Sequence, residues 1–305
     1  MMKFQTSLKK KVRFTGKGLH CGRIVLMDVL PAKADTGIVF HRTDDLRAKP
    51  VAAHSLNISS TALSTTIGHG ESAVSTIEHI MAALSGLGIT NAIVKLNAPE
   101  VPIMDGSARP FVSAFQEVGI ESLAAPQKVF AVKRSFEIRH GEQFIRVNPS
   151  RRAKISCKID FPHEMIGSQS VEFYPSADSF TNIAQARTFC HIKDVNYMKE
   201  NGLALGGSLD NAIVITDDGL LNREGLRSSI EFVEHKLLDL IGDIALLGAP
   251  LLGEISASRP GHGLHAEFTK ALLENDVLEE IYLENPPRPK EFSKDFVVPV
   301  FASLG

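Results

Sequence analysis

The stretch EFVEHKLLDLIGD, residues 231–243, carries side chains that could bind a metal ion. His235, Asp239 and Asp243 follow one another at intervals of four residues, and positions i and i+4 are neighbours on one face of an α-helix. Most other positions are apolar, so these side chains form a narrow polar stripe with Lys236 at its edge. A surface stripe is one interpretation, but surface stripes are usually Glu and Lys, whereas His and Asp at this spacing can hold one metal ion.

A second stretch repeats part of this pattern. TIEHIMAAL at 76–84 resembles FVEHKLLDL at 232–240, and both place Glu-His near the start of a helix. Asp105-Gly106 also follows His79 at the same interval at which Gly261-His262 follows His235. The repeat predicts a duplicated unit whose two Glu-His helices lie face to face, with a site between the halves.

Such a site would contain three candidate metal ligands, namely His79, His235 and Asp239. Three protein ligands and one open position are typical of a catalytic zinc ion, which makes hydroxide available near neutral pH. Any metal must be held by His and carboxylate, because the three cysteines, at positions 21, 157 and 190, stand far apart. We therefore expect one Zn²⁺ per chain.

Two further residues could move protons at this site. Glu78 could act as general base, or it could be the capping-box partner of Ser75 at the helix start. His262, in the loop RPGHG, could protonate a leaving amine with Asp243 holding its ring, although a lone loop histidine often has no role. Both interpretations of each residue stay open on the sequence alone.

The elements around these residues predict an α+β fold. Short strands precede a helix at about 75–86, a strand, and a helix from about 105 to 119; ESLAAPQK at 121–128 reads as a linker. Strands follow again, then helices near 177–186, from about 224 to 247 and after 261, with LLGEISAS as one strand. We predict domains at 1–124 and 125–284, each with two helices layered on a small, mainly antiparallel sheet, and a tail at 285–305.

The composition excludes several classes of protein. With 44% hydrophobic and 22% charged residues and a formal net charge of −2, the chain has the profile of a soluble globular protein without a general attraction for nucleic acid. No apolar run is long enough to span a bilayer, and no signal peptide opens the chain. The sparse, odd number of cysteines favours the cytoplasm. We expect a monomer that binds a small-molecule substrate.

Several longer motifs occur together and in order: NAPEVPIMDGSARPFV, ARTF, LALGGSLDNAIV, EFVEHKLLDLIGD and PGHGL. This set resembles the UDP-3-O-acyl-N-acetylglucosamine deacetylases, zinc amidases of lipid A biosynthesis in Gram-negative bacteria, from TGKGLHCG to about residue 275. The resemblance implies two domains with zinc between them, ligands His79, His235 and Asp239, Glu78 as general base, and His262 as general acid held by Asp243. It also implies that Thr188 donates a hydrogen bond to the oxyanion.

The resemblance extends to the substrate. It implies contacts to the sugar, the diphosphate, the uridine and the active-site mouth from His20, Leu63, Asp160, Phe161, Phe189, Gly207 and Lys236. The family also has a βαβ insert, here about 190–215, that lines a passage for the fatty acyl chain. The local sequence agrees, because IKDVNYMKEN has one apolar stripe at helical spacing and NAIVI is β-rich. We expect the passage to be lined by Ile192, Val195, Met198, Leu203, Ala204, Leu209 and Val214.

The chain departs from the family pattern at three positions. Cys190 and His191 stand where the family usually has Gly-Phe, and His265 stands where it often has Asn. These changes concern substrate fit and local packing, because the catalytic set is complete. In some relatives the C-terminus controls proteolytic turnover. Acyl-chain length and the native metal, zinc or iron, are not specified by the sequence; a zinc amidohydrolase of another N-acetyl sugar and a non-catalytic UDP-sugar sensor are the alternatives.

Overall fold

The structure of the chain, a computed structural model, describes residues 4–282. Its helices are α1 (Glu78–Gly86), α2 (Arg109–Val118), α3 (Ala177–Ile183), α4 (Ile192–Glu200), α5 (Glu231–Ile244) and α6 (His262–Glu274). Short 3₁₀ turns occupy Ser55–Asn57, Gly70–Ser72 and Ala245–Leu247. The predicted tail at 285–305 lies outside the described residues.

Two five-stranded sheets have the same topology. The first has the order β2 (Val12–Lys17), β3 (Ile24–Pro31), β8 (Ala92–Leu96), β4 (Ile38–Arg42) and β5 (Val51–Ala52). The second has the order β11 (Phe136–His140), β12 (Gln143–Asn148), β19 (Glu254–Ser258), β13 (Lys154–Asp160) and β14 (Ser168–Phe173). In both, the third and fourth strands are parallel and the other neighbours are antiparallel. An internal duplication would give this match; the duplication itself and the domain limits stay predictions.

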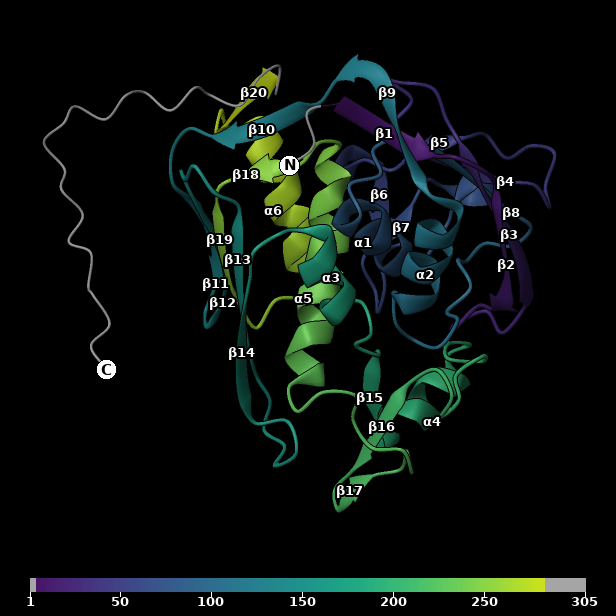
Figure 1. Cartoon of the computed structure of the whole chain (residues 1–305). Coiled ribbons are helices and arrows are strands. Elements are labelled where there is room, and N and C mark those ends of the chain that lie inside the picture. Colours follow the sequence, from purple (N-terminus) through teal and green to yellow (C-terminus); the bar gives the residue numbers. More distant parts are fainter. Residues whose placement is uncertain (1–3, 283–305) are drawn as a thin grey trace, which may run out of the picture.

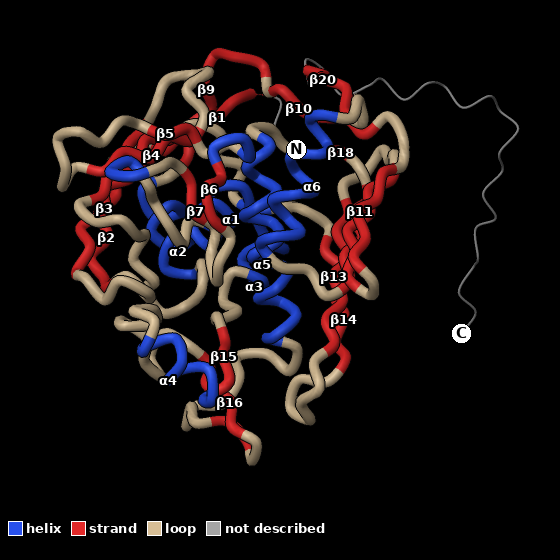
Figure 2. Tube along the Cα trace, turned by 180° about the vertical axis from the view of Figure 1, so that it is seen from behind, coloured by secondary structure: helices blue, strands red, loops and turns tan. Residues whose placement is uncertain are grey.

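The helices other than α4 lie between the two sheets, and α4 lies beside β15 (Phe189–His191) and β16 (Ile213–Thr216) (Figure 1). In the first sheet α1 precedes the last strand in sequence, β8, and α2 follows it; in the second sheet α5 precedes β19 and α6 follows it. Helix α1 packs directly against α5. Seen from behind, helices α1, α3 and α5 again occupy the middle, with sheet strands on either side (Figure 2). The chain therefore has the mixed α+β architecture that the sequence predicts, with its helical layer in the interior.

Smaller sheets complete the structure. Strand β1 (Phe4–Leu8) pairs with β9 (Ile120–Pro126), and β10 (Lys128–Val132) lies between β18 (Leu251–Leu252) and β20 (Leu278–Tyr282). A hairpin joins β6 (Ile58–Ser60) to β7 (Thr66–Ile67). Parallel strands β15 (Phe189–His191) and β16 (Ile213–Thr216) are connected through α4, and β17 (Gly219–Leu220) extends their sheet. This βαβ unit occupies the region where the sequence places an insert.

Three sequence predictions about elements are wrong. Residues 121–128 are not an unstructured linker, because most of them belong to β9. This strand forms by pairing with β1 at the start of the chain. The helix predicted from 224 begins at Glu231, since Gly225 adopts a φ of 72° in the preceding turn. LLGEISAS forms two strands rather than one, and Gly253 between them has no room for a side chain against Val132.

The crossing of α1 and α5 is unusually close because Gly242 lies at it. A Cβ atom at Gly242 would lie 2.8 Å from the carbonyl carbon of Glu78, closer still to its oxygen, and 3.1 Å from the backbone nitrogen of Ala82. Only glycine lets two backbones approach in this way. This contact sets the distance between the two helices that carry the candidate metal ligands.

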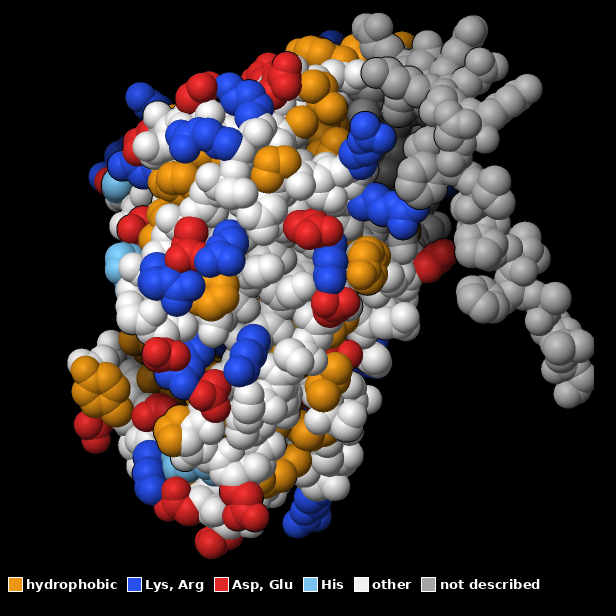
Figure 3. Space-filling model, turned by 90° about the vertical axis from the view of Figure 1, so that its left-hand side faces the viewer, with side chains coloured by type: hydrophobic (Ala, Val, Ile, Leu, Met, Phe, Trp, Pro, Cys, Tyr) orange, Lys and Arg blue, Asp and Glu red, His pale blue; other side chains and the backbone are white. Residues whose placement is uncertain are grey.

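The surface agrees with the small net charge. Figure 3 shows basic and acidic side chains intermixed over one face of the molecule, and many are paired, as Arg13 is with Asp28 and Arg47 with Asp45. Within residues 4–282, the helices are all too short or too polar to cross a membrane.

Candidate active site

The three candidate metal ligands converge where α1 meets α5. His79 stands in the first turn of α1, and His235 and Asp239 lie one turn apart on α5; all three side chains are buried. The Asp239 Oδ1 atom lies 3.6 Å from His79 Nε2 and 3.4 Å from His235 Nε2. The imidazole rings meet edge to face with centroids 5.1 Å apart. The helices predicted to face each other do so.

These atoms fit a divalent metal ion. Tetrahedral zinc with ligands at about 2.0–2.1 Å places the ligand atoms roughly 3.4 Å from one another. Asp239 Oδ1 is buried and has no hydrogen-bond donor among the described residues, so an acceptor is left for a cation. The His235 Nδ1 atom faces the carbonyl oxygen of Ala186 at 3.1 Å, and burial lowers the pKa of His235 to about 3. His235 is therefore neutral, with Nε2 directed toward the shared position, as a metal ligand requires.

Glu78 stands beside this cluster, on the first residue of α1. Its Oε2 accepts a hydrogen bond from the backbone N–H of Thr65 at 3.0 Å. Ser75 instead donates to the carbonyl oxygen of Pro99, and the N-cap residue, Ile77, makes no side-chain cap, so the capping-box interpretation is wrong. Burial raises the pKa of Glu78 despite the opposing charges of His262 and His79. A carboxylate with a raised pKa is suited to accept a proton near neutral pH.

His262 and Asp243 form an ion pair on the other side of the pocket. The His262 Nδ1 atom donates to Asp243 Oδ2 at 2.7 Å. Burial lowers the pKa of His262, but Asp243 outweighs it and raises that pKa to about 9. For Asp243, burial raises the pKa, while His262 and His265 together hold it at about 2. At neutral pH His262 is therefore a cation that can give up a proton.

A pocket of about 240 Å³ joins these groups. Glu78, His79, His235, Asp239 and His262 line it together with residues that include His20, Leu63, Thr188, Phe189 and Lys236. Ten of the residues predicted for the site thus share one cavity. Four other predicted residues, Asp160, Phe161, Gly207 and Asp243, do not line it, although Asp243 contacts His262 directly.

Thr188 is held in place by a buried ion pair next to it. The guanidinium of Arg187, only 2% exposed, donates to Glu231 at 2.9 Å, and Glu231 begins α5. The Thr188 backbone N–H donates to the carbonyl oxygen of Gly106 in the first half of the chain. The ion pair ties the ARTF segment to α5 within the second half, and the Thr188 N–H ties it to the first half, so that Thr188 reaches the pocket.

Of the predicted substrate residues, Lys236 and Phe189 line the pocket, whereas Phe161 and Asp160 lie outside its lining. Lys236 donates to Asp239 Oδ2 at 2.7 Å and lies 5.6 Å from the ring centroid of Phe189. Phe161 stacks edge-on against Phe189 with centroids 5.7 Å apart, which places the KIDF strand end beside the pocket. The neighbouring Asp160 is exposed and forms an ion pair with Arg259, so its carboxylate is engaged at the surface.

The predicted acyl-passage residues lie in the βαβ unit but outside this pocket. Ile192, Val195 and Met198 are half-buried on one side of α4, Ala204 and Val214 are buried, and Leu209 is 43% exposed. The unit adjoins the pocket through His20, because the Ala204 N–H approaches His20 Nδ1 at 3.4 Å and the Leu205 N–H donates to the His20 carbonyl oxygen. Their role toward an acyl chain stays a prediction.

Two residues that organise the site escaped the sequence analysis. Thr65 contacts both Glu78 and Asp243. Glu100, 1% exposed, accepts hydrogen bonds from the backbone N–H groups of His20 and Cys21 and from the hydroxyl of Thr76. Nothing near Thr65 in the sequence signals this position. Glu100 stands in the motif NAPEVP, where an acidic residue between apolar neighbours was a signal for burial with partners.

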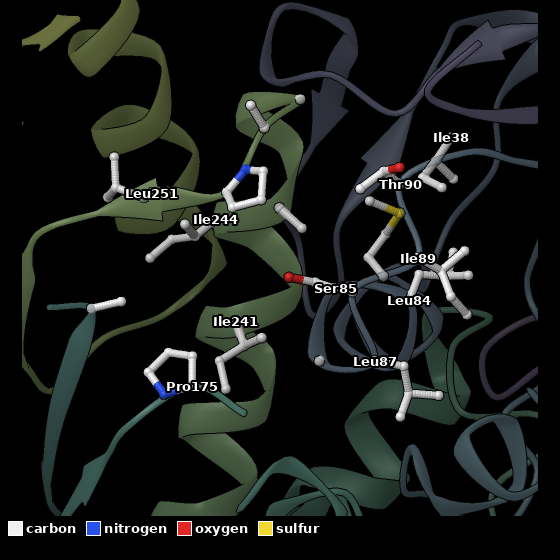
Figure 4. Close-up of a pocket in the computed structure, with 18 of the residues that line it drawn as sticks. Ile38, Leu84, Ser85, Leu87, Ile89, Thr90, Pro175, Ile241, Ile244 and Leu251 are labelled. Carbon is white, nitrogen blue, oxygen red and sulfur yellow. The ribbon is translucent and has the colours of Figure 1, made fainter. Parts of the chain in front are cut away.

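A larger cavity of about 510 Å³ lies at the other end of the central helices (Figure 4). Ser85 of α1 and Ile241 and Ile244 of α5 face it, and its lining is mainly apolar. Among the described residues that line it, none belongs to the His79/His235/Asp239 set or to the Asp243/His262/His265 set. Both candidate metal clusters therefore lie outside the larger cavity.

A pocket that combines a set of metal-binding side chains with one proton acceptor and one proton donor is typical of metal-assisted hydrolases. Comparison with known proteins narrows this class. The model of the family described as LpxC, UDP-3-O-acyl N-acetylglycosamine deacetylase, matches residues 5–274, and the chain belongs to this family.

Individual relatives agree. The chain is 48% identical over 275 residues to the UDP-3-O-acyl-N-acetylglucosamine deacetylase of Citrifermentans bemidjiense, covering 89% of the chain and 90% of that protein. It is 43% identical over 296 residues to the protein of the same name from Campylobacter fetus, covering 96% and 99%, and 43% identical over 287 residues to that from Pseudomonas entomophila, covering 92% and 94%.

Proposed function

We propose that the chain hydrolyses the N-acetyl group of a UDP-3-O-acyl-N-acetylglucosamine and releases acetate and a free amine, in the pathway to lipid A. The observation that carries the proposal is the pocket in which His79, His235 and Asp239 meet Glu78 and His262. Family membership and the names of the relatives support the substrate. A non-catalytic sensor would not need both a proton acceptor and a proton donor.

The metal site would be formed by His79 and His235 through Nε2 and by Asp239 through Oδ1. When bound, a zinc ion supplies a Lewis acid that activates water and polarises the amide carbonyl. Glu78 would take a proton from the attacking water, since burial raises its pKa and the Thr65 N–H fixes one of its oxygens. Among residues 4–282 no hydrogen bond engages the other oxygen, and the Glu78 side chain lines the pocket.

Collapse of the tetrahedral intermediate needs a proton on the leaving nitrogen. His262 would supply it, because Asp243 keeps the ring cationic and binds Nδ1, so that Nε2 carries the transferable proton. Thr188 would donate its hydroxyl to the oxyanion, for which the ARTF segment is held rigidly. These roles assign the two proton transfers of amide hydrolysis to one base, Glu78, and one acid, His262.

The substrate would extend from this centre in two directions. Lys236 and Phe189, at the pocket, would contact the diphosphate and the sugar, with His20, Leu63 and Gly207 completing the sugar side; Phe161 and Asp160 would hold the uridine. The acyl chain would run toward the βαβ unit, which adjoins His20. Its residues Met198 and Ala204 would line the passage.

The decisive experiment is a turnover assay with purified protein and UDP-3-O-acyl-N-acetylglucosamine, followed by release of acetate and free amine. We expect turnover, its loss on chelation, and its recovery on adding back zinc. Activity in a verified metal-free preparation would remove the metal from the proposal. Turnover of another N-acetyl sugar in place of this one would keep the chemistry and change the substrate.

A further inference from the structure

The Asp243 carboxylate accepts hydrogen bonds from three residues, one in the loop between β6 and β7 and two on α6. Its Oδ2 atom accepts from His262 Nδ1 at 2.7 Å and from His265 Nδ1 at 2.6 Å, and its Oδ1 atom accepts from the Thr65 hydroxyl at 2.6 Å. Asp243 and Thr65 are 2% and 1% exposed, and His265 is fully buried. These hydrogen bonds are therefore shielded from bulk solvent.

Thr65 connects the two sides of the pocket. Its hydroxyl donates to Asp243, which binds the proposed acid, while its backbone N–H donates to Glu78, the proposed base. The Thr65 oxygen also lies 3.2 Å from His262 Nδ1. A single residue thus contacts both arms that would carry protons.

His265 is placed to act as a neutral donor. Burial lowers its pKa, although Asp243 opposes this effect. Its Nε2 atom is buried without a hydrogen-bond partner among the described residues, which agrees with a ring that holds its proton on Nδ1, toward Asp243. His262 is then the cationic histidine, and the neutral His265 donates to the same oxygen of Asp243 without adding a second positive charge.

We propose that Thr65 and His265 are positioning residues that jointly fix the Asp243 carboxylate and thereby orient and tune the acid His262. This inference rests on the proposed function and adds two residues to it. Each donor withdraws charge from Asp243 and holds one of its oxygens, so removing a donor leaves a more basic carboxylate that retains the His262 proton more strongly. The other charged groups that face His262 are Glu78 of α1 and Asp239 of α5, and they remain unchanged.

The test uses pairs of variants that differ in one donor. Thr65→Val removes the hydroxyl and keeps the backbone N–H to Glu78, whereas Thr65→Ser keeps both. His265→Leu removes the ring, whereas His265→Asn can place its amide nitrogen where Nδ1 lies. Thr269→Val is the matched control, because that buried hydroxyl donates to the His265 carbonyl oxygen and does not contact Asp243.

The readouts are the His262 pKa, measured by NMR titration of the metal-loaded protein, and the basic limb of kcat/KM. We expect Thr65→Val and His265→Leu each to move both upward by roughly one pH unit, a tenfold change, with kcat lowered. Thr65→Ser, His265→Asn and Thr269→Val should leave both in place. Because the two donors share one carboxylate, the double variant should shift by less than the sum of the single shifts.

Several outcomes would overturn the inference. If the two donor-removing variants lose thermal stability while the His262 pKa and the basic limb match those of Thr269→Val, the contacts are structural only. A shift in His265→Asn equal to that in His265→Leu would refute the role as simple donor. If Thr65→Val does not fold, the His265 pair decides alone. The NMR titration needs no turnover, so it remains decisive even if the protein does not deacetylate the proposed substrate.

Discussion

Replacing Gly242 by alanine should damage the metal site without changing any ligand. The added Cβ would stand 2.8 Å from the carbonyl carbon of Glu78 and 3.1 Å from the backbone nitrogen of Ala82, where ordinary contacts begin at 3.4 Å. Neither neighbour is the end of a flexible side chain, so the helices must separate. Glu78 and His79 lie on one helix, and His235 and Asp239 lie on the other, so their separation changes with it.

The structure allows the size of the effect to be worked out. Relieving the contact with the carbonyl carbon alone requires a shift of about 0.6 Å, whereas metal–ligand distances tolerate only about 0.2 Å. We expect metal affinity to fall about 10–100-fold, comparable to the loss of an outer-shell partner. Overpacking should also cost about 1–3 kcal/mol of stability, even though alanine is by itself a better helix former than glycine by about 1 kcal/mol.

The assay is a chelator competition for zinc, combined with thermal unfolding and kcat. Gly263→Ala is the matched control, because a Cβ there meets only the Thr61 hydroxyl, at 3.7 Å. It should keep its metal affinity and its unfolding temperature. If Gly242→Ala binds zinc as tightly as the parent and retains its rate, the close helix crossing does not set the ligand geometry, and the reasoning fails.

Four further outcomes are expected. Glu78→Gln should lose about 10²–10⁴-fold in kcat with its metal content and melting temperature retained; a loss confined to melting temperature would make Glu78 structural. Asp239→Ala should lower the metal content per chain measured by elemental analysis, and an unchanged content would remove Asp239 from the ligand set. Burial lowers the pKa of His262, but Asp243 outweighs this effect and raises it to about 9, so the rate should fall as pH rises toward 9, and at a lower pH when a bound metal cation repels the proton. The stability that the His262–Asp243 pair contributes is fully present below the unfolded pKa of about 6.5 and should be lost as pH rises through the folded pKa. A rate and an unfolding free energy that stay constant over this pH range would contradict both expectations. Ala204→Trp should reduce kcat/KM more for long acyl chains than for short ones, since each buried CH₂ contributes about 0.8 kcal/mol; an equal loss at every chain length would show that Ala204 does not contact the chain.

Local sequence patterns were sufficient to predict the helices that carry the candidate metal ligands. The i, i+4 spacing of His235 and Asp239 placed both on one face of α5, and the repeated Glu-His pair predicted that α1 would oppose it. The linker prediction failed because β9 exists only through its pairing with β1, more than a hundred residues away in the chain. Pairing of this kind leaves little trace in composition or periodicity.

The parts of the site that were missed depend on tertiary contacts. Thr65 and Asp243 lie 178 residues apart in the sequence. The local sequence around Thr65 does not distinguish it from a threonine in an ordinary polar loop. The capping-box alternative for Glu78 was consistent with local rules, yet the buried Thr65 N–H took that carboxylate instead. His265 stands one turn after His262 on α6, and its local sequence does not distinguish a hydrogen bond to Asp243 from the other roles of a buried histidine.

The division of the site between α1 and α5 also bears on how the protein is made. The ribosome adds roughly 5–20 residues per second, so about 8–30 s pass between the synthesis of His79 and that of His235. During this interval the side of α1 that packs on α5 in the finished structure, where the buried Ala82 lies opposite Gly242, has no partner. The first half of the nascent chain therefore exposes this face of α1 until α5 has been synthesised. We expect general chaperones to contact α1 during translation.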